Sequence, residues 1–203
     1  MIAVIDYGLG NLQSVAGAVE KLGFQVAVTS NPEELEKADK LILPGVGAFA
    51  DGMKNLEKLG LIKVLNSLVL KQKKPILGIC LGFQLMAKDS YEFGHHKGLG
   101  WFDASVIKLK PGKDLRIPHV GWNGLEPAQP NVLFENIPRE ALFYYTHSFH
   151  VKLNQEDQVL GKCVYGIPFT AVAKKENIYG TQFHPEKSQQ FGLKLLENFL
   201  KKG

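Results

Sequence analysis

The chain has 203 residues, 45% of them hydrophobic, which is enough apolar material for one buried core and predicts a single domain, 1–203. Its formal net charge of +4 arises from 24 basic and 20 acidic residues, a balance that argues against a nucleic-acid binder with a clustered basic face. The chain has only two cysteines, which are too few for a disulfide framework, and their spacing is not that of a metal site. The sequence shows neither a signal-peptide pattern nor an apolar run of about 18 residues, so we expect a cytoplasmic protein.

The first half of the chain alternates short apolar runs with amphipathic stretches. Strands are predicted at 2–6, 24–28, 40–43 and 75–79, and helices at 12–22, from Pro32, at 61–69 and at 81–87. Strand–helix alternation with short connections is typical of a parallel α/β sheet covered by helices on both faces.

The second half of the chain has a different pattern of predicted elements from the first. Strands are predicted at 106–109, 142–145, 149–153, 159–164, 170–173 and 178–183, separated by Pro and Gly turns, before a last helix at 188–200. No low-complexity linker divides the halves. We therefore expect these strands to extend the same sheet in antiparallel fashion.

Cys80 lies between a predicted strand and a predicted helix, with Gly78 and Gly82 two positions to either side. A free cysteine is most often a small buried apolar residue. The paired glycines instead favour a nucleophile elbow, because strand and helix approach closely around a strained nucleophile. Such a turn favours the thiolate and directs the Leu81 amide towards a developing oxyanion.

His184 and Glu186 lie where the last predicted strand ends. In an extended segment, side chains two positions apart point to the same side. A histidine can accept the thiol proton, and a carboxylate can hold its ring in the required tautomer. The segment from Pro44 to Gly47 follows the third predicted strand and is expected beside the elbow, because ligands bind at the carboxyl ends of such strands.

These residues carry a resemblance. The run from Gly78 to Gln84, together with His184-Pro-Glu186, resembles the class I (triad) glutamine amidotransferases. Within that class the chain is similar to the glutaminase subunits of imidazole glycerol phosphate synthase, through motifs at 6–14, 43–49, 118–123, 146–149 and 183–188. The resemblance implies a flavodoxin-like three-layer fold with a mostly parallel central sheet, and no cofactor.

The resemblance also implies an activity. Cys80 attacks the side-chain amide of glutamine, His184 transfers protons, and a thioester is hydrolysed to glutamate. The ammonia passes to a (β/α)8-barrel cyclase that makes imidazole glycerol phosphate and an aminoimidazole carboxamide ribonucleotide in histidine biosynthesis.

The resemblance also implies roles for further residues, from their positions in the motifs. Gly45, Val46 and Leu81 are expected to form the oxyanion hole, and the predicted glutamine-binding residues are Gly47, Gln84, Glu92, His147, Ser148 and Phe149. The predicted partner-interface residues are Asn11, Trp122, Asn123, Tyr144 and Lys187.

Val46 departs from the wider class, in which many members place a second glycine there. Valine is β-branched and disfavours positive φ. We therefore hypothesise that the isolated chain has an incomplete oxyanion hole, and that the ligand-loaded partner drives a peptide rotation that completes it.

Two other functions remain open at this point. One is a different enzyme on this fold, either a glutaminase that serves another synthase or a cysteine hydrolase of non-amide substrates; Gln84 and the 44–47 loop argue against both. A non-catalytic docking module is the other alternative, and the intact set of Cys80, His184 and Glu186 argues against it.

Overall fold

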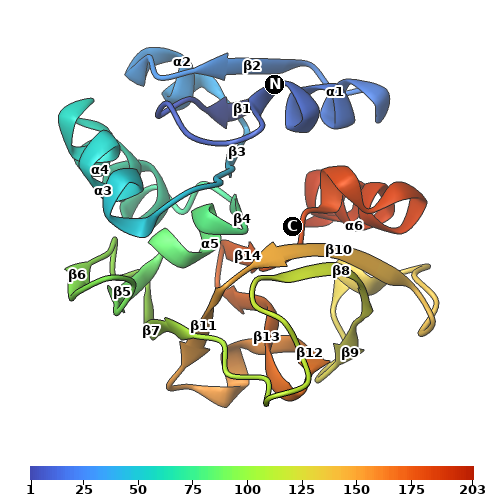
Figure 1. Ribbon diagram of the computed structural model, residues 1–203. Helices are drawn as coiled ribbons and strands as arrows, with labels where there is room; N and C mark the ends of the chain where they lie inside the picture. Colours follow the sequence, from blue (N-terminus) through green and yellow to red (C-terminus); the bar gives the residue numbers. More distant parts are fainter.

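The computed structural model describes all 203 residues and is built around an eight-stranded mixed sheet in the order β2-β1-β3-β4-β14-β13-β12-β9 (Figure 1). Its first five strands are parallel: β2 (Val26–Thr29), β1 (Ile2–Ile5), β3 (Lys40–Leu43), β4 (Ile76–Ile79) and β14 (Ile178–Thr181). The predicted parallel α/β sheet is therefore present, with strand bounds within two residues of those expected.

Alternating side chains of these short strands enter two separate cores, which makes three layers. Ile2 and Val4 pack with α1 (Leu12–Lys21) and α6 (Gln189–Lys202) on one face. Ala3 and Ile5 pack on the other face, against a layer that contains α2 (Pro32–Lys37), α3 (Phe49–Lys58), α4 (Leu61–Asn66) and α5 (Leu81–Leu85). Every residue of β1 and β4 is buried, as expected for strands covered on both sides. None of the helices has the length and apolar content needed to cross a membrane.

The predicted antiparallel extension is confirmed for part of the second half only. After β14 the sheet continues antiparallel through β13 (Ile167–Lys175), β12 (Val159–Tyr165) and β9 (Glu126–Pro127). The segments predicted at 106–109, 142–145 and 149–153 lie outside this sheet, so that part of the expectation was wrong.

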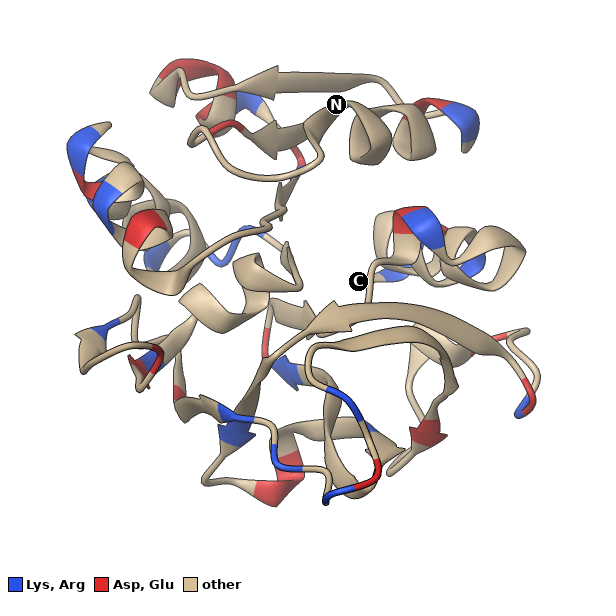
Figure 2. Cartoon of the chain, in the orientation of Figure 1, with Lys and Arg blue, Asp and Glu red and all other residues tan.

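Those segments belong to two smaller sheets. β11 (Phe149–Leu153), β7 (Phe102–Lys108), β5 (Ala87–Ser90) and β6 (His96–Lys97) form one of them. β8 (His119–Gly124) and β10 (Leu142–His147) form an antiparallel ribbon, which carries no Lys, Arg, Asp or Glu (Figure 2). The period-2 pattern identified strands but contained no information about which strand pairs with which.

The helices differ from prediction in two places. α3 was not predicted, because only Phe49, Gly52 and Leu56 are buried in an otherwise largely polar stretch. The helix after Cys80 ends at Leu85 rather than 87, because the carbonyls of Leu85 and Ala87 accept bonds from the amides of Leu99 and Gly100. The helix predicted at 61–69 is present as α4, and a π-helical turn, Ser67–Lys71, follows it.

The turn between β4 and α5 is too tightly packed for a side chain at Gly82. A Cβ there would lie 1.8 Å from the Leu43 carbonyl oxygen of the neighbouring strand. We expect Gly82→Ala to lower the free energy of unfolding by about 3 kcal/mol, the upper part of the usual overpacking range, because the obstacle is backbone.

Denaturant unfolding measures this effect, and Gly17→Ala is the matched control. Gly17 lies inside α1, and a Cβ at this position would have no other atom within 4 Å, so alanine there should stabilise the helix by about 0.5–1 kcal/mol. Equal stability of the two variants would contradict the proposed close approach.

Candidate active site

Cys80 occupies the turn between β4 and α5 in a strained backbone conformation. Its φ is 53° and its ψ is −107°, a region that non-glycine residues rarely adopt. The strain is held by hydrogen bonds on both sides, from the Cys80 amide to the Thr181 carbonyl at 2.7 Å and from the Gln84 amide to the Cys80 carbonyl at 3.1 Å. The predicted elbow is therefore present, and such strain is typical of functional sites.

His184 and Glu186 follow β14 and form a buried pair. Nδ1 of His184 lies 2.8 Å from Oε1 of Glu186, and their side chains are 2% and 1% exposed. A carboxylate can only accept, so Nδ1 carries the proton and Nε2 of the neutral ring is left as the acceptor. Nε2 has no hydrogen-bond partner in the structure, which leaves it free to accept a proton.

The electrostatic surroundings of His184 favour its protonated form. Burial alone lowers the pKa of this ring, but attraction to a Cys80 thiolate and the contact with Glu186 outweigh burial and raise the pKa to about 10. Although the ring and the sulfur interact electrostatically, they do not meet hydrogen-bond geometry, since Nε2 is unpaired. A Cys80 thiolate and the Glu186 contact therefore stabilise the protonated ring.

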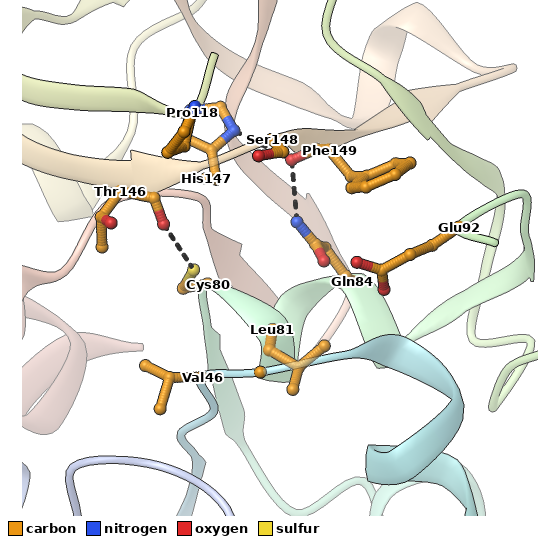
Figure 3. A pocket seen from close by; sticks show the side chains of 11 residues that line it. Val46, Cys80, Leu81, Gln84, Glu92, Pro118, Thr146, His147, Ser148 and Phe149 are labelled. Atoms are coloured by element: carbon orange, nitrogen blue, oxygen red, sulfur yellow. Dashed lines mark hydrogen bonds between the residues drawn. The ribbon is translucent and has the colours of Figure 1, made fainter.

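A cavity of about 330 Å³ opens beside the Cys80 sulfur (Figure 3). Most of its wall consists of residues predicted from the sequence, and Pro118 and Thr146 join them. The predicted residues in the wall are Val46, Gly47, Cys80, Leu81, Gln84, Glu92, His147, Ser148 and Phe149. Segments far apart in the chain thus meet at the carboxyl end of β4, as expected for a parallel sheet.

Two polar side chains of the cavity are held by backbone groups. Oε2 of Glu92 accepts a hydrogen bond from the Phe49 amide at 2.6 Å, at the start of α3. Nε2 of Gln84 donates to the Phe149 carbonyl at 2.9 Å. An acidic group and an amide are therefore fixed in the wall of the cavity.

The backbone at Gly45 occupies the expected oxyanion position. The Leu81 amide donates to the Gly45 carbonyl, with 3.3 Å between nitrogen and oxygen. In a trans peptide the carbonyl and the next amide point in opposite directions, so the Val46 N–H points away from the elbow. In this conformation neither predicted amide donor is available to a substrate.

The wall residue His147 forms a pair with a second buried histidine, His119. Nδ1 of His119 lies 3.0 Å from Nε2 of His147, whose own Nδ1 lies 2.9 Å from the Phe149 carbonyl. The carbonyl can only accept, so His147 carries its proton on Nδ1 and accepts at Nε2 from His119. Burial lowers the pKa of His119 to about 4 and that of His147 to about 3.

These neutral rings predict acid sensitivity. As the pH falls from about 6.5 to about 4, the unfolded chain gains a proton at each histidine, whereas the folded chain does not. The free energy of unfolding therefore falls by about 1.4 kcal/mol per pH unit for each ring. Denaturant unfolding between about pH 7 and pH 5 measures the slope. His147→Gln should reduce the slope of unfolding free energy against pH by about 1.4 kcal/mol per pH unit. An unchanged slope would contradict the assignment of His147 as a buried neutral ring. His95→Gln, at an exposed ring, is the control.

The predicted interface residues lie in three segments: the β8–β10 ribbon, the start of α1 and the turn after β14. Trp122 and Tyr144 lie side by side on the outer face of the β8–β10 ribbon, with ring centroids 5.7 Å apart in an edge-to-face arrangement. Asn123 points inward instead, with its Nδ2 3.1 Å from Nε2 of His119. Asn11 precedes α1, and Lys187 lies in the short turn Pro185–Lys187 after β14.

The structure brings two groups to the nucleophile, and a third to the loop beside it, that motif reasoning did not select. The Thr146 carbonyl lies 4.0 Å from the sulfur, and the Gln182 amide nitrogen lies 3.7 Å from it. The hydroxyl of Tyr7 donates to the Pro44 carbonyl at 2.7 Å, beneath the loop. Thr146 and Gln182 lie within or beside the motifs already identified, but their roles depend on backbone direction and packing, which spacing does not encode.

The comparison with known proteins agrees with this geometry. The family described as "Glutamine amidotransferase class-I" matches residues 3–202. The chain belongs to this family. A class-I amidotransferase is an enzyme, and the predicted class and fold are thereby confirmed.

Similar proteins carry a more specific name. "Imidazole glycerol phosphate synthase subunit HisH 1" of Campylobacter jejuni is 52% identical over 99% of this amidotransferase and 100% of its own length. HisH 2 of Methanococcus maripaludis is 47% identical over 99% of both chains. The amidotransferase is thus a member of the HisH group.

Solved structures of more distant proteins share the fold. PurLQS from Thermotoga maritima has a TM-score of 0.75 at 19% identity, over 98% of this amidotransferase and 96% of that chain. A glutamine amidotransferase from the same organism has a TM-score of 0.68 at 18% identity, over 98% of this chain and 95% of its own.

Proposed function

We propose that this amidotransferase hydrolyses glutamine at Cys80 and delivers the ammonia to a (β/α)8-barrel cyclase, which makes imidazole glycerol phosphate and an aminoimidazole carboxamide ribonucleotide in histidine biosynthesis. The observation that carries the proposal is the cavity that places the elbow sulfur opposite Gln84 and Glu92, with the His184–Glu186 pair buried beside it. The names of the HisH relatives support the choice of partner.

The chemistry follows from the acceptor at Nε2 of His184. This nitrogen takes the thiol proton, and the sulfur of Cys80 forms a bond to the side-chain amide carbon of glutamine. The C–N bond then breaks, the nitrogen leaves as ammonia with the proton from His184, and a thioester remains. Water attacks the thioester after losing a proton to His184, which releases glutamate and returns the proton to the sulfur.

The cavity walls suit the amino-acid end of glutamine. The Glu92 carboxylate offers an ionic partner for the α-ammonium group, and its Phe49 contact fixes its position. Gln84 and the backbone of residues 147–149 offer hydrogen bonds to the rest of the molecule. Gly47 also lines the cavity, and its φ of 115° is a conformation that favours glycine.

The outer face of the β8–β10 ribbon suits a protein partner. Val120, Trp122 and Leu142 are 56%, 40% and 48% exposed, and the ribbon carries no charge (Figure 2). Exposed apolar side chains with aromatic residues among them are typical of interface centres. We propose that the cyclase covers this face, with Tyr144 beside Trp122 and with Asn11, Asn123 and Lys187 at or near its rim.

The test is a binding and activity assay with the cyclase subunit of the same organism. We expect a stable heterodimer that releases glutamate and ammonia from glutamine, and an approximately 30-fold weaker Kd for Trp122→Ala, as for an aromatic interface anchor. Tyr91→Ala, at an exposed aromatic residue of another loop, should bind normally. Glutamine hydrolysis without any cyclase binding would instead favour a glutaminase of another synthase, and no hydrolysis at all would favour a docking module.

A further inference from the structure

Gln182 is a completely buried polar side chain in contact with the nucleophile. It follows β14 and is 0% exposed. Its Nε2 donates to the sulfur of Cys80 at 3.7 Å, and its Oε1 accepts from Nε2 of Gln84 at 3.2 Å. Gln84 in turn donates to the Phe149 carbonyl at 2.9 Å.

The direction of this chain of hydrogen bonds is determined by its first member. The Phe149 carbonyl can only accept, so the amide of Gln84 must present its nitrogen there. The second proton of that nitrogen points at Gln182, so the Gln182 side chain must accept it with Oε1. Nε2 of Gln182 is thereby left facing the sulfur, because the opposite rotamer of the amide would set two donors against each other.

A donor aimed at sulfur distinguishes the two forms of the nucleophile. A thiolate is a strong acceptor, whereas the sulfur of a neutral thiol accepts only weakly. Hydrogen bonds to charged groups are stronger than those between neutral groups, and a buried site strengthens them further. The contact therefore favours the thiolate.

We propose that Gln182 is a further catalytic residue, an amide donor that stabilises the Cys80 thiolate and whose orientation is imposed by Gln84 and the Phe149 carbonyl. This inference deepens the proposed glutaminase activity and rests on it. The donor acts twice in the cycle: it stabilises the sulfur before attack on the amide carbon, and again when the thioester C–S bond breaks and the electron pair returns to sulfur. No proton moves to or from Gln182 in either step.

The test measures alkylation of Cys80 by iodoacetamide at about pH 7, with the modified residue located by mass spectrometry so that Cys163 is distinguished. Gln182→Met keeps the length of the side chain and removes the donor, and we expect alkylation about tenfold slower than in the parent enzyme. Gln158→Met, at another buried glutamine that lies outside the cavity, is the matched control and should alkylate at the parent rate.

A second variant tests the imposed orientation. Gln84→Met removes the orienting donor without adding charge, so the amide of Gln182 is no longer required to present Nε2 to the sulfur. We expect alkylation to slow by about threefold although residue 84 does not touch the sulfur, and the double variant to be no slower than Gln182→Met alone.

Thermal unfolding verifies that each variant is folded, and the Gln84→Met measurement decides alone if Gln182→Met is not. Alkylation within about twofold of the parent rate in a folded variant overturns the proposal. Because iodoacetamide reacts without glutamine, this outcome is distinguishable from loss of glutamine hydrolysis, which a parallel glutamate assay reports.

Discussion

Cys80→Ala is expected to reduce glutamine hydrolysis by a factor of about 10⁴ or more, because no thioester can form without the sulfur. No other nucleophile lines the cavity in a comparable position: the hydroxyl-bearing residues in its wall are Thr146 and Ser148, and neither lies at the strained elbow. A glutamate-release assay on the complex with its cyclase measures the loss.

The second cysteine provides the control for this experiment. Cys163 is buried in β12, and burial raises the pKa of its thiol above the usual range, so it is unreactive at neutral pH. Cys163→Ala should keep the activity of the parent enzyme. If Cys80→Ala retained hydrolysis while binding of the cyclase stayed intact, the assignment of the nucleophile would be wrong.

The elbow at Cys80 and the His184–Glu186 pair were predictable because the geometry of each is local. Gly78 and Gly82 mark the elbow in the sequence, and the spacing of His184 and Glu186 places both side chains on one side of an extended segment. The structure adds that Nδ1 and Oε1 lie 2.8 Å apart. The parallel sheet was predictable for a similar reason, since fully buried strands between amphipathic helices allow few other arrangements.

The remaining features depend on contacts between distant segments. The pairing of β8 with β10, and of β11 with β7, separates these strands from the main sheet, and a period-2 pattern does not specify partners. Gln182 is adjacent to the triad in sequence, but its role arises only because the Phe149 carbonyl orients Gln84 from another sheet. Individual hydrogen-bond directions of this kind require coordinates.

In this conformation the backbone at Gly45 and Val46 blocks the predicted oxyanion hole. Rotation of this one peptide would remove the Gly45 carbonyl from the Leu81 amide, now 3.3 Å away, and would turn the Val46 amide towards the sulfur. Two donors would thus be gained together. Gly45 itself tolerates no side chain, since a Cβ there would lie 2.3 Å from the Tyr7 hydroxyl.

The cost of the rotation falls on Val46. Its φ is not positive in this conformation, and turning the peptide by about half a revolution moves φ towards the region that β-branched residues avoid. We therefore expect the isolated enzyme to turn over glutamine about 10²–10³ times more slowly than the complex with a ligand-loaded cyclase, the factor associated with a missing oxyanion donor.

Val46→Gly should relieve part of that cost and raise the turnover of the isolated enzyme by about tenfold, because glycine adopts positive φ without steric penalty. Turnover of the loaded complex should change little, so the stimulation by the cyclase shrinks by the same factor. Val164→Gly, at an exposed valine of β12, is the matched control and should leave both rates unaltered. Equal glutaminase rates for the isolated parent enzyme and its loaded complex would show that the Gly45 carbonyl does not limit catalysis, and the strain at Val46 would then have no catalytic consequence.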